Sequence, residues 1–303
     1  MTDSTVGRMP AMKAVWMEQL RVVGLAIRRE GTLAAAVLAL GSVAVVAFAR
    51  MPVLQAMVND EMGALVFDPG DPPWGFFAVL AALLLPLVVW KCERRFGDTP
   101  LWSMPVDHRR HALLKVAAGW VWLLAILGAA LVWATLTTLV SGGSLGVDEA
   151  RLLVLDPAGA IAGTPGAVES VNWTTPWWEW AFPFTSATAA YLLASTLILA
   201  TARPVFWAAG LWVAGMLVFG AGALALDSGD IWDIGWIERA ARFAAWSWYV
   251  GADSFTRWLP LPAGGGRVWT ILPTASMWAA SAAFWISLGL AGVLVASGRP
   301  RNQ

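Results

Sequence analysis

Long apolar runs, each about the length needed to cross a lipid bilayer, recur along this chain and constrain its fold more than any other feature. The hydrocarbon core of a bilayer is about 30 Å thick, which takes roughly 20 apolar residues of α-helix. Only helices and closed barrels satisfy the polar backbone in lipid. The stretches that fit such a helix are residues 32–49, 74–90, 116–140, 180–201, 204–226 and 272–297. The sequence therefore predicts an all-α integral membrane protein with six transmembrane helices.

The overall composition agrees with a membrane protein. Hydrophobic residues make up 58% of the 303 residues and charged residues only 13%, which is more apolar than a water-soluble domain of this length could bury. Most of the 21 tryptophans lie near the ends of the apolar runs. At those positions an amphipathic ring lies at the level of the lipid headgroups. We therefore interpret the tryptophans mainly as anchors.

The distribution of charge between the apolar runs predicts how the chain is oriented. The N-terminal segment and the connection at residues 91–115 are rich in Lys and Arg, whereas the connection at 141–179 is mainly acidic. Short basic connections lie on the cytoplasmic side of a membrane. We therefore expect both termini to be cytoplasmic, with residues 32–303 forming the transmembrane domain. The extracytoplasmic regions would then be 141–179 and 227–271.

The segment before the first span has an amphipathic pattern. Trp16, Leu20, Val23 and Ile27 recur on one narrow stripe, and the charged residues lie off it. This pattern is typical of a helix that lies in the membrane surface. We expect residues 1–31 to contain a cytoplasmic interfacial helix that leads into the first span.

A second amphipathic region lies before the last span. Residues 231–246 have a broad apolar face, and the aromatic stretch "SWYVGADSFTRWLPLP" follows them. The first segment is too short and too charged to span, and Pro260 would stop a helix in the second. We expect a pair of short interfacial or re-entrant helices here.

Residues that carry chemistry are scarce. Cys92 is the only cysteine, and His108 and His111 are the only histidines, so this chain has few of the ligands that metals or haem prefer. The chain also lacks a Gly-Lys pair and with it the usual phosphate-binding loop. We expect no catalytic residue, metal or cofactor in this chain.

The connection at residues 91–115, "KCERRFGDTPLWSMPVDHRRHALLK", combines basic and apolar residues. Leu101, Trp102 and Met104 lie among charges, as in a protein interface with an apolar centre and a charged rim. The alternative is that these cations only set the topology and bind anionic lipid. The apolar residues among the charges favour a partner site.

The same connection resembles the loop between the second and third spans of ABC-2 type permeases, the membrane subunits of many bacterial ABC exporters. The residues that match the family pattern are Glu93, Arg94, Arg95, Gly97, Thr99, Pro105, Val106, Arg109, Arg110 and Lys115. Asp98 and Pro100 depart from it. The predicted order of interfacial helix, spans and short outer helices is also similar to the family's layout.

The resemblance implies a bacterial inner-membrane permease driven by a separate cytosolic ATPase subunit, which would bind the ATP and Mg. The residues that would form the ATPase-coupling loop are Glu93, Arg94, Arg95, Gly97, Leu101, Trp102, Met104, Pro105, Arg109, Arg110 and Lys115. The resemblance also implies a second permease subunit, identical or related. Gly210, Ala214 and Gly222 lie on one stripe of the fifth span and are candidates for that interface.

The substrate and two other functions stay open. Spans without charge and with many aromatics suggest that a hydrophobic or amphipathic substrate is exported. Ion-driven carriers usually have ionisable residues within their spans, and the predicted spans have essentially none between their ends. A secondary carrier or channel is therefore the weaker alternative, and a membrane scaffold that transports nothing is the other.

Overall fold

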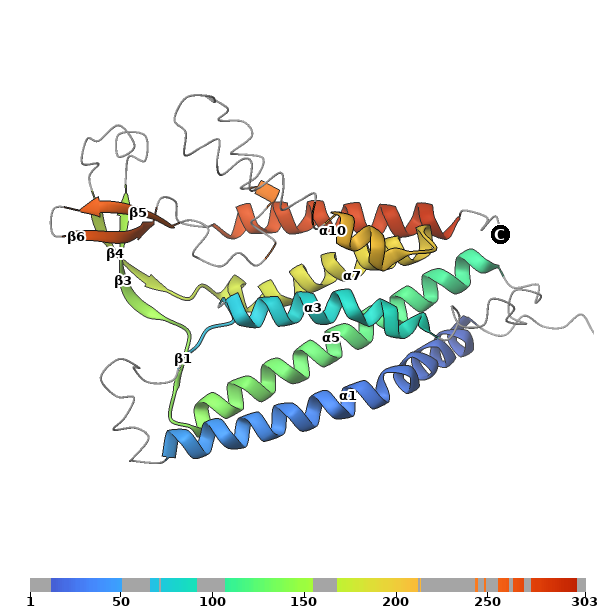
Figure 1. Ribbon diagram of the computed structural model, residues 1–303, viewed down its shortest axis with the longest axis horizontal. Helices are drawn as coiled ribbons and strands as arrows, with labels where there is room; N and C mark the ends of the chain where they lie inside the picture. The colour runs from blue at the N-terminus through green and yellow to red at the C-terminus, as the bar shows by residue number, and fades with distance from the viewer. Residues whose placement is uncertain are drawn as a thin grey trace, which may run out of the picture.

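The computed structural model describes residues 12–50, 66–70, 72–91, 107–154, 168–211, 213, 243–244, 248, 256–261, 264–269 and 274–298. Long helices lie side by side in a bundle, with a small sheet at one end (Figure 1). The helices are α1 (Met12–Arg50), α3 (Pro72–Val89), α5 (His108–Val140), α7 (Phe182–Ala200) and α10 (Ala275–Ser297). The short 3-10 helix η2 (Trp177–Ala181) leads into α7.

The membrane-protein class is confirmed by the length and apolar character of these helices. Within the part of the chain that is described, 4 helices are long and apolar enough to cross a membrane, at residues 13–47, 109–140, 177–200 and 275–297. A shorter apolar helix covers Trp74–Val89. The predicted span at 204–226 is helical over 204–211, and most of its remainder lies outside the described residues.

Helix α1 continues without a break through the expected boundary at residues 31 and 32, for 39 residues in all. A helix of that length measures roughly 58 Å, about twice the thickness of a bilayer core. The expected apolar stripe packs on protein rather than on lipid: Val23 and Ile27 are buried, and Trp122 of α5 donates a hydrogen bond to the Leu20 carbonyl at 2.9 Å. Residues 12–31 are thus helical and run directly into the first span, and their position in the membrane surface stays a prediction.

Contacts between α1 and α5 extend to the other end of both helices. The indole nitrogen of Trp133 donates to the Ser42 hydroxyl at 2.6 Å. The Arg50 guanidinium donates to the Val140 carbonyl at 2.9 Å, where both helices end. These bonds hold α1 and α5 together along most of their length.

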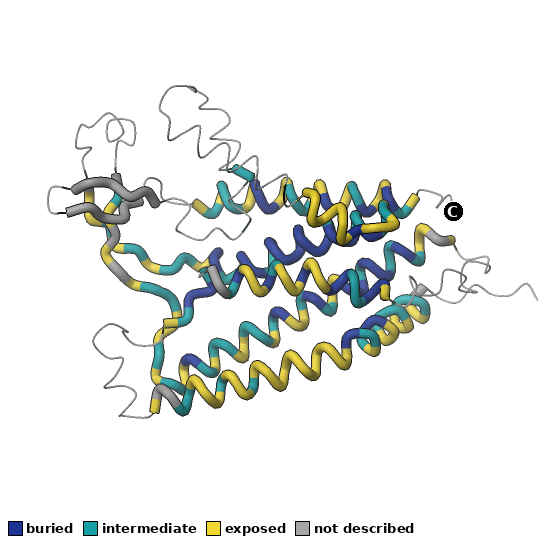
Figure 2. Tube along the Cα trace, viewed as in Figure 1, coloured by how far each residue is buried: buried dark blue, intermediate teal, exposed yellow. Residues whose placement is uncertain are grey.

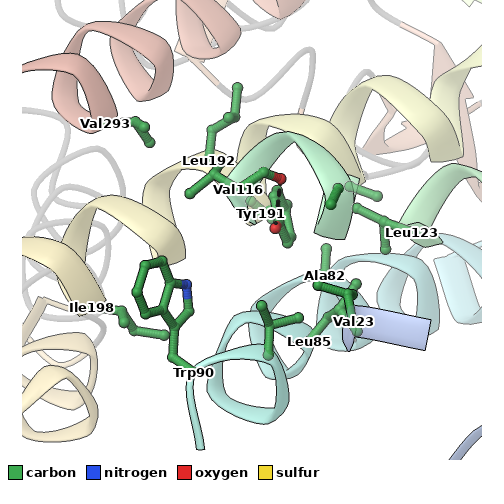
Figure 3. Close-up of a cluster of buried hydrophobic side chains, with 14 of the residues drawn as sticks. Val23, Ala82, Leu85, Trp90, Val116, Leu123, Tyr191, Leu192, Ile198 and Val293 are labelled. Carbon is green, nitrogen blue, oxygen red and sulfur yellow. Dashed lines mark hydrogen bonds between the residues drawn. The ribbon is translucent and has the colours of Figure 1, made fainter. Parts of the chain in front are cut away.

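Helix α7 forms the centre of the bundle and packs on α3 and on α10. Most residues of α7 are buried, whereas most of α1 is exposed (Figure 2). Tyr191 is fully buried within a cluster that draws on α1, α3, α5, α7 and α10 (Figure 3). Its hydroxyl donates to the Val116 carbonyl of α5 at 2.9 Å. This bond joins α7 to α5 inside the cluster.

Small residues let α10 approach α7 closely. A Cβ atom added to Gly289 would lie 2.7 Å from the Leu192 Cβ, and one added to Gly292 would lie 2.7 Å from the Thr196 hydroxyl. The Thr196 hydroxyl also lies 3.2 Å from the Gly289 carbonyl, to which it donates. Close backbone contact of this kind is a main source of helix association in lipid, where water does not drive the helices together.

The sheet at one end of the bundle was not expected from the sequence. Its order is β4-β3-β6-β5. The strands are β3 (Asp148–Val154), β4 (Val168–Thr174), β5 (Thr256–Leu261) and β6 (Gly264–Trp269). Two antiparallel hairpins are joined by a parallel pairing of Leu153 with Trp269. A smaller parallel pair, β1 (Val66–Phe67) with β2 (Ser144–Leu145), lies beside the bundle.

This sheet corrects the prediction of a second short helix for residues 256–261, whereas 249–255 of the same stretch lie outside the described residues. Residues 256–261 form an edge strand, in which Pro260 lies opposite Gly265. Proline is tolerated there because an edge strand can leave a backbone position unpaired. Of the first expected short helix, 231–246, only Phe243 and Ala244 are described, and both are helical.

Candidate functional site

The candidate coupling site lies at the end of the bundle opposite the sheet, where α3 ends and α5 begins (Figure 1). Helices α7 and α10 also end there, and α1 begins there. Most residues predicted for the coupling loop lie outside the described residues: Glu93, Arg94, Arg95, Gly97, Leu101, Trp102, Met104 and Pro105. Arg109, Arg110 and Lys115 are described, and all three belong to α5.

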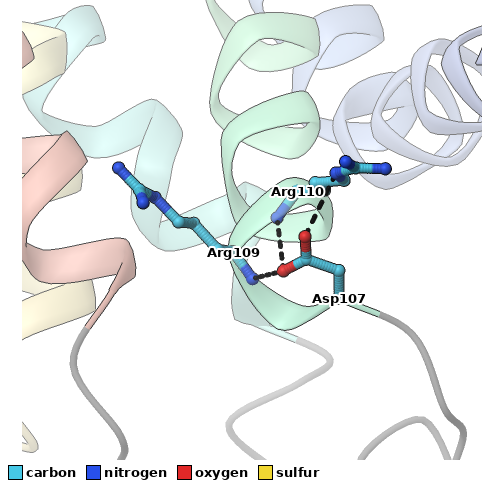
Figure 4. A network of polar contacts seen from close by, with 3 residues as sticks. All are labelled: Asp107, Arg109 and Arg110. Carbon is cyan, nitrogen blue, oxygen red and sulfur yellow. Dashed lines mark hydrogen bonds and ion pairs between the residues drawn. The ribbon is translucent and has the colours of Figure 1, made fainter.

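Asp107 fixes where α5 begins (Figure 4). One of its carboxylate oxygens accepts hydrogen bonds from the backbone nitrogens of Arg109 at 3.1 Å and Arg110 at 3.4 Å. The other lies 3.1 Å from the Arg110 side chain, in an exposed ion pair. An acidic N-cap satisfies free backbone donors and complements the positive end of the helix dipole. Arg109 and Arg110 are therefore presented to solvent from a well-defined helix start, with the Arg109 guanidinium pointing away from Asp107.

We expect Asp107→Ala to destabilise the protein by about 1 kcal/mol, because the first turn of α5 loses its N-cap. The melting temperature of the purified protein in detergent measures this loss. Arg110→Ala is the matched control, since it removes the exposed ion pair and leaves the cap intact. Exposed ion pairs contribute little, so equal losses in the two variants would contradict the assignment of Asp107 as a cap.

Lys115 differs from the two arginines, because it is buried, with 3% of its surface exposed. Its ammonium lies 4.7 Å from the centre of the Trp90 ring, at the end of α3. The predicted coupling segment ended at Lys115, but α5 already begins at His108. Lys115 therefore lies within the helix and inside the bundle, and not on the surface that carries Arg109 and Arg110.

At the opposite end, the structure brings together two carboxylates that the sequence separates widely. Asp68 and Glu179 are both buried. A Cβ atom added to Gly70 would lie 2.6 Å from a Glu179 carboxylate oxygen and 2.9 Å from one of Asp68. The Asp68 carboxylate accepts from the Gly70 nitrogen at 2.9 Å and from the Thr175 hydroxyl at 3.4 Å. Neither carboxylate was predicted as part of a site, because no local pattern indicates that the two segments meet.

Aromatic contacts also connect the segment before α3 with the segment before α7. The centre of the Phe67 ring lies 5.7 Å from that of Trp74 and 6.1 Å from that of Trp180. No group of three or more potential metal-ligating side chains occurs in the described ranges. The hydrogen bond from Thr175 to Asp68 joins the segments that lead into α3 and α7.

Of the residues predicted to face a second subunit, Gly210 is described. It is exposed, and among the described residues no side chain lies within 4 Å of the position that its Cβ would occupy. Ala214 and Gly222 lie outside the described residues. Gly210 therefore lies on an exposed face of the described part of this helix.

Comparison of the chain with family models, with curated proteins and with solved structures finds no match.

Proposed function

We propose that this protein is the permease subunit of an ATP-driven exporter, with both termini in the cytoplasm and with its energy supplied by a separate cytosolic ATPase. The observation that carries the proposal is the exposed pair Arg109 and Arg110 at the capped start of α5. This pair ends a connection whose sequence resembles the coupling loop of ABC-2 type permeases. Helix α5 is bonded to α1 and to α7, so force applied at its start would reach the bundle.

Such a connection would couple ATP hydrolysis to transport as a rigid-body movement. A partner that binds the loop and changes shape displaces the helices to which the loop is attached. Leu101, Trp102 and Met104 would supply the apolar centre of the interface, and the neighbouring cations its rim. Two copies of this chain, or this chain and a related one, would enclose the path of a hydrophobic or amphipathic substrate, with the exposed face at Gly210 between them.

The double variant Trp102→Ala, Arg109→Glu tests the proposal. We expect a cytosolic ATPase to co-purify with the wild-type chain from its native host and to be lost from the double variant. The reason is that one change removes an aromatic anchor and the other reverses a rim charge. Retention of the ATPase with full coupling would contradict the assignment of the loop.

The matched control makes the same two types of change at the other end of the molecule. Trp177→Ala removes an exposed tryptophan next to α7, and Arg151→Glu reverses a charge on β3. This control should keep the ATPase bound. If the wild-type chain has no ATPase partner and transports in ATP-free liposomes under an ion gradient alone, the protein is a secondary carrier and the proposal is wrong.

A further inference from the structure

A charged side chain buried at the base of the candidate coupling loop has no place in the docking surface described above. Lys115 is 3% exposed, and its neighbours Ala112 and Val116 belong to the buried cluster. Burial of an ammonium is unfavourable unless other groups compensate for the lost water. Its position therefore needs an explanation beyond the electrostatics of an exposed rim.

Trp90 provides one compensating contact. The Lys115 ammonium lies over the Trp90 ring at 4.7 Å from the ring centre, within the range in which a cation is attracted to the face of an aromatic ring. This attraction is stronger where water is excluded, and Trp90 is only 4% exposed. The contact thus joins two buried groups on two different helices.

Trp90 is held from two further directions. Its backbone nitrogen donates to the Pro86 carbonyl at 3.0 Å, which fixes it at the end of α3. Its ring faces the buried cluster that includes Ile198 of α7 (Figure 3). Within the described structure the indole nitrogen has no hydrogen-bond partner, so packing and the Lys115 ammonium determine how the ring is oriented.

The contact joins the two helix ends that flank residues 92–106, because α3 ends just before this segment and α5 begins just after it. We propose that Lys115 and Trp90 form a clamp that fixes the separation of these two helix ends, so that displacement of the loop moves α3 and α5 as one unit. Lys115 is thus a positioning residue, distinct from the docking residues Arg109 and Arg110. The coupling role of the clamp rests on the proposed function, whereas the contact itself does not.

A double-mutant cycle on the isolated chain tests the contact without any ATPase. We expect Trp90→Leu to lower the melting temperature by about 2–6 °C more in a chain that has Lys115 than in one that carries Lys115→Leu. The reason is that the buried Lys115 ammonium loses its contact with the ring only when Lys115 is present. Lys115→Arg keeps a cation that can stack on the ring and should preserve the difference. The control cycle pairs Trp90→Leu with Arg109→Leu, an exposed change on the same helix, and should be additive. Additive behaviour of Lys115 and Trp90 would overturn the clamp.

A second measurement tests the coupling role. In the complex with its ATPase, Lys115→Leu should leave co-purification intact but lower the rate of MgATP hydrolysis by about tenfold, and Lys115→Arg should restore it. Loss of co-purification in Lys115→Leu would show that Lys115 acts in docking, which contradicts the proposal. An unchanged hydrolysis rate would also overturn it. If no ATPase associates with the wild-type chain, the proposed function fails, and the cycle on the isolated chain still decides whether the clamp exists.

Discussion

A Gly119→Val substitution is expected to lower the stability of this protein by about 1–3 kcal/mol, the usual effect of overpacking a well-packed interior. Gly119 lies on α5, where an added Cβ atom would overlap the Tyr191 hydroxyl. Tyr191 is fully buried and donates to the Val116 carbonyl. The new side chain must displace a ring that contacts several helices, so α5 and α7 would separate. The melting temperature of the purified protein in detergent should fall by several degrees, at roughly 2–4 °C per kcal/mol of lost stability.

The control for Gly119→Val is the same substitution at Gly128, which lies on the same helix and has no described side chain within 4 Å of its Cβ position. Both variants change the helix propensity equally, so their difference isolates the packing at Tyr191. Gly128→Val should melt close to wild type. Equal losses at Gly119 and Gly128 would show that the contact between α5 and α7 is not as described.

A Gly289→Leu substitution should have a similarly large effect at the contact between α10 and α7. An added Cβ atom would lie 2.7 Å from the Leu192 Cβ and 3.4 Å from the backbone nitrogen of Leu193. Backbone atoms cannot rotate away as a side chain can, so the two helices must move apart. We expect a loss of about 1–3 kcal/mol and a broader elution profile in size-exclusion chromatography.

Gly41→Leu is the control for this second substitution. Gly41 is an exposed residue of α1, and within the described part of the chain no side chain lies within 4 Å of its Cβ position. A leucine there would meet lipid, which is as apolar as leucine itself. A wild-type profile for Gly289→Leu would contradict the close approach of α10 to α7.

Four of the six apolar runs predicted helices that are long enough to cross a membrane, because the thickness of a bilayer sets the length of such a run. The expected span at 180–201 is α7, Phe182–Ala200, and the one at 272–297 contains α10, Ala275–Ser297. The start of α5 was predicted too late, at 116. Hydropathy marks the apolar part of a helix and not its first turn. The signal for the true start was present in Asp107, a residue type that favours N-caps and precedes the helical stretch "HRRHALLK".

Features that depend on distant pairing were not predictable in the same way. The strands β3 and β6 come from connections on either side of α7, and neither connection has a continuous alternating pattern. The burial of Lys115 depends on Trp90, which another helix supplies. The same holds for Asp68 and Glu179, which come together only when the segments before α3 and α7 meet. Each of these three features depends on how the helices pack, and the local sequence pattern does not contain that information.

The pairing of Leu153 with Trp269 also means that the sheet is assembled in a fixed order while the protein is synthesised. The hairpin of β3 and β4 leaves the ribosome well before the hairpin of β5 and β6, because α7 and its following segment lie between them. Until β6 arrives, one edge of β3 has no neighbour, and an unpaired edge is a site at which chains aggregate. A chain that is truncated before β6 would retain this open edge. The sheet can therefore be completed only after synthesis has passed β6.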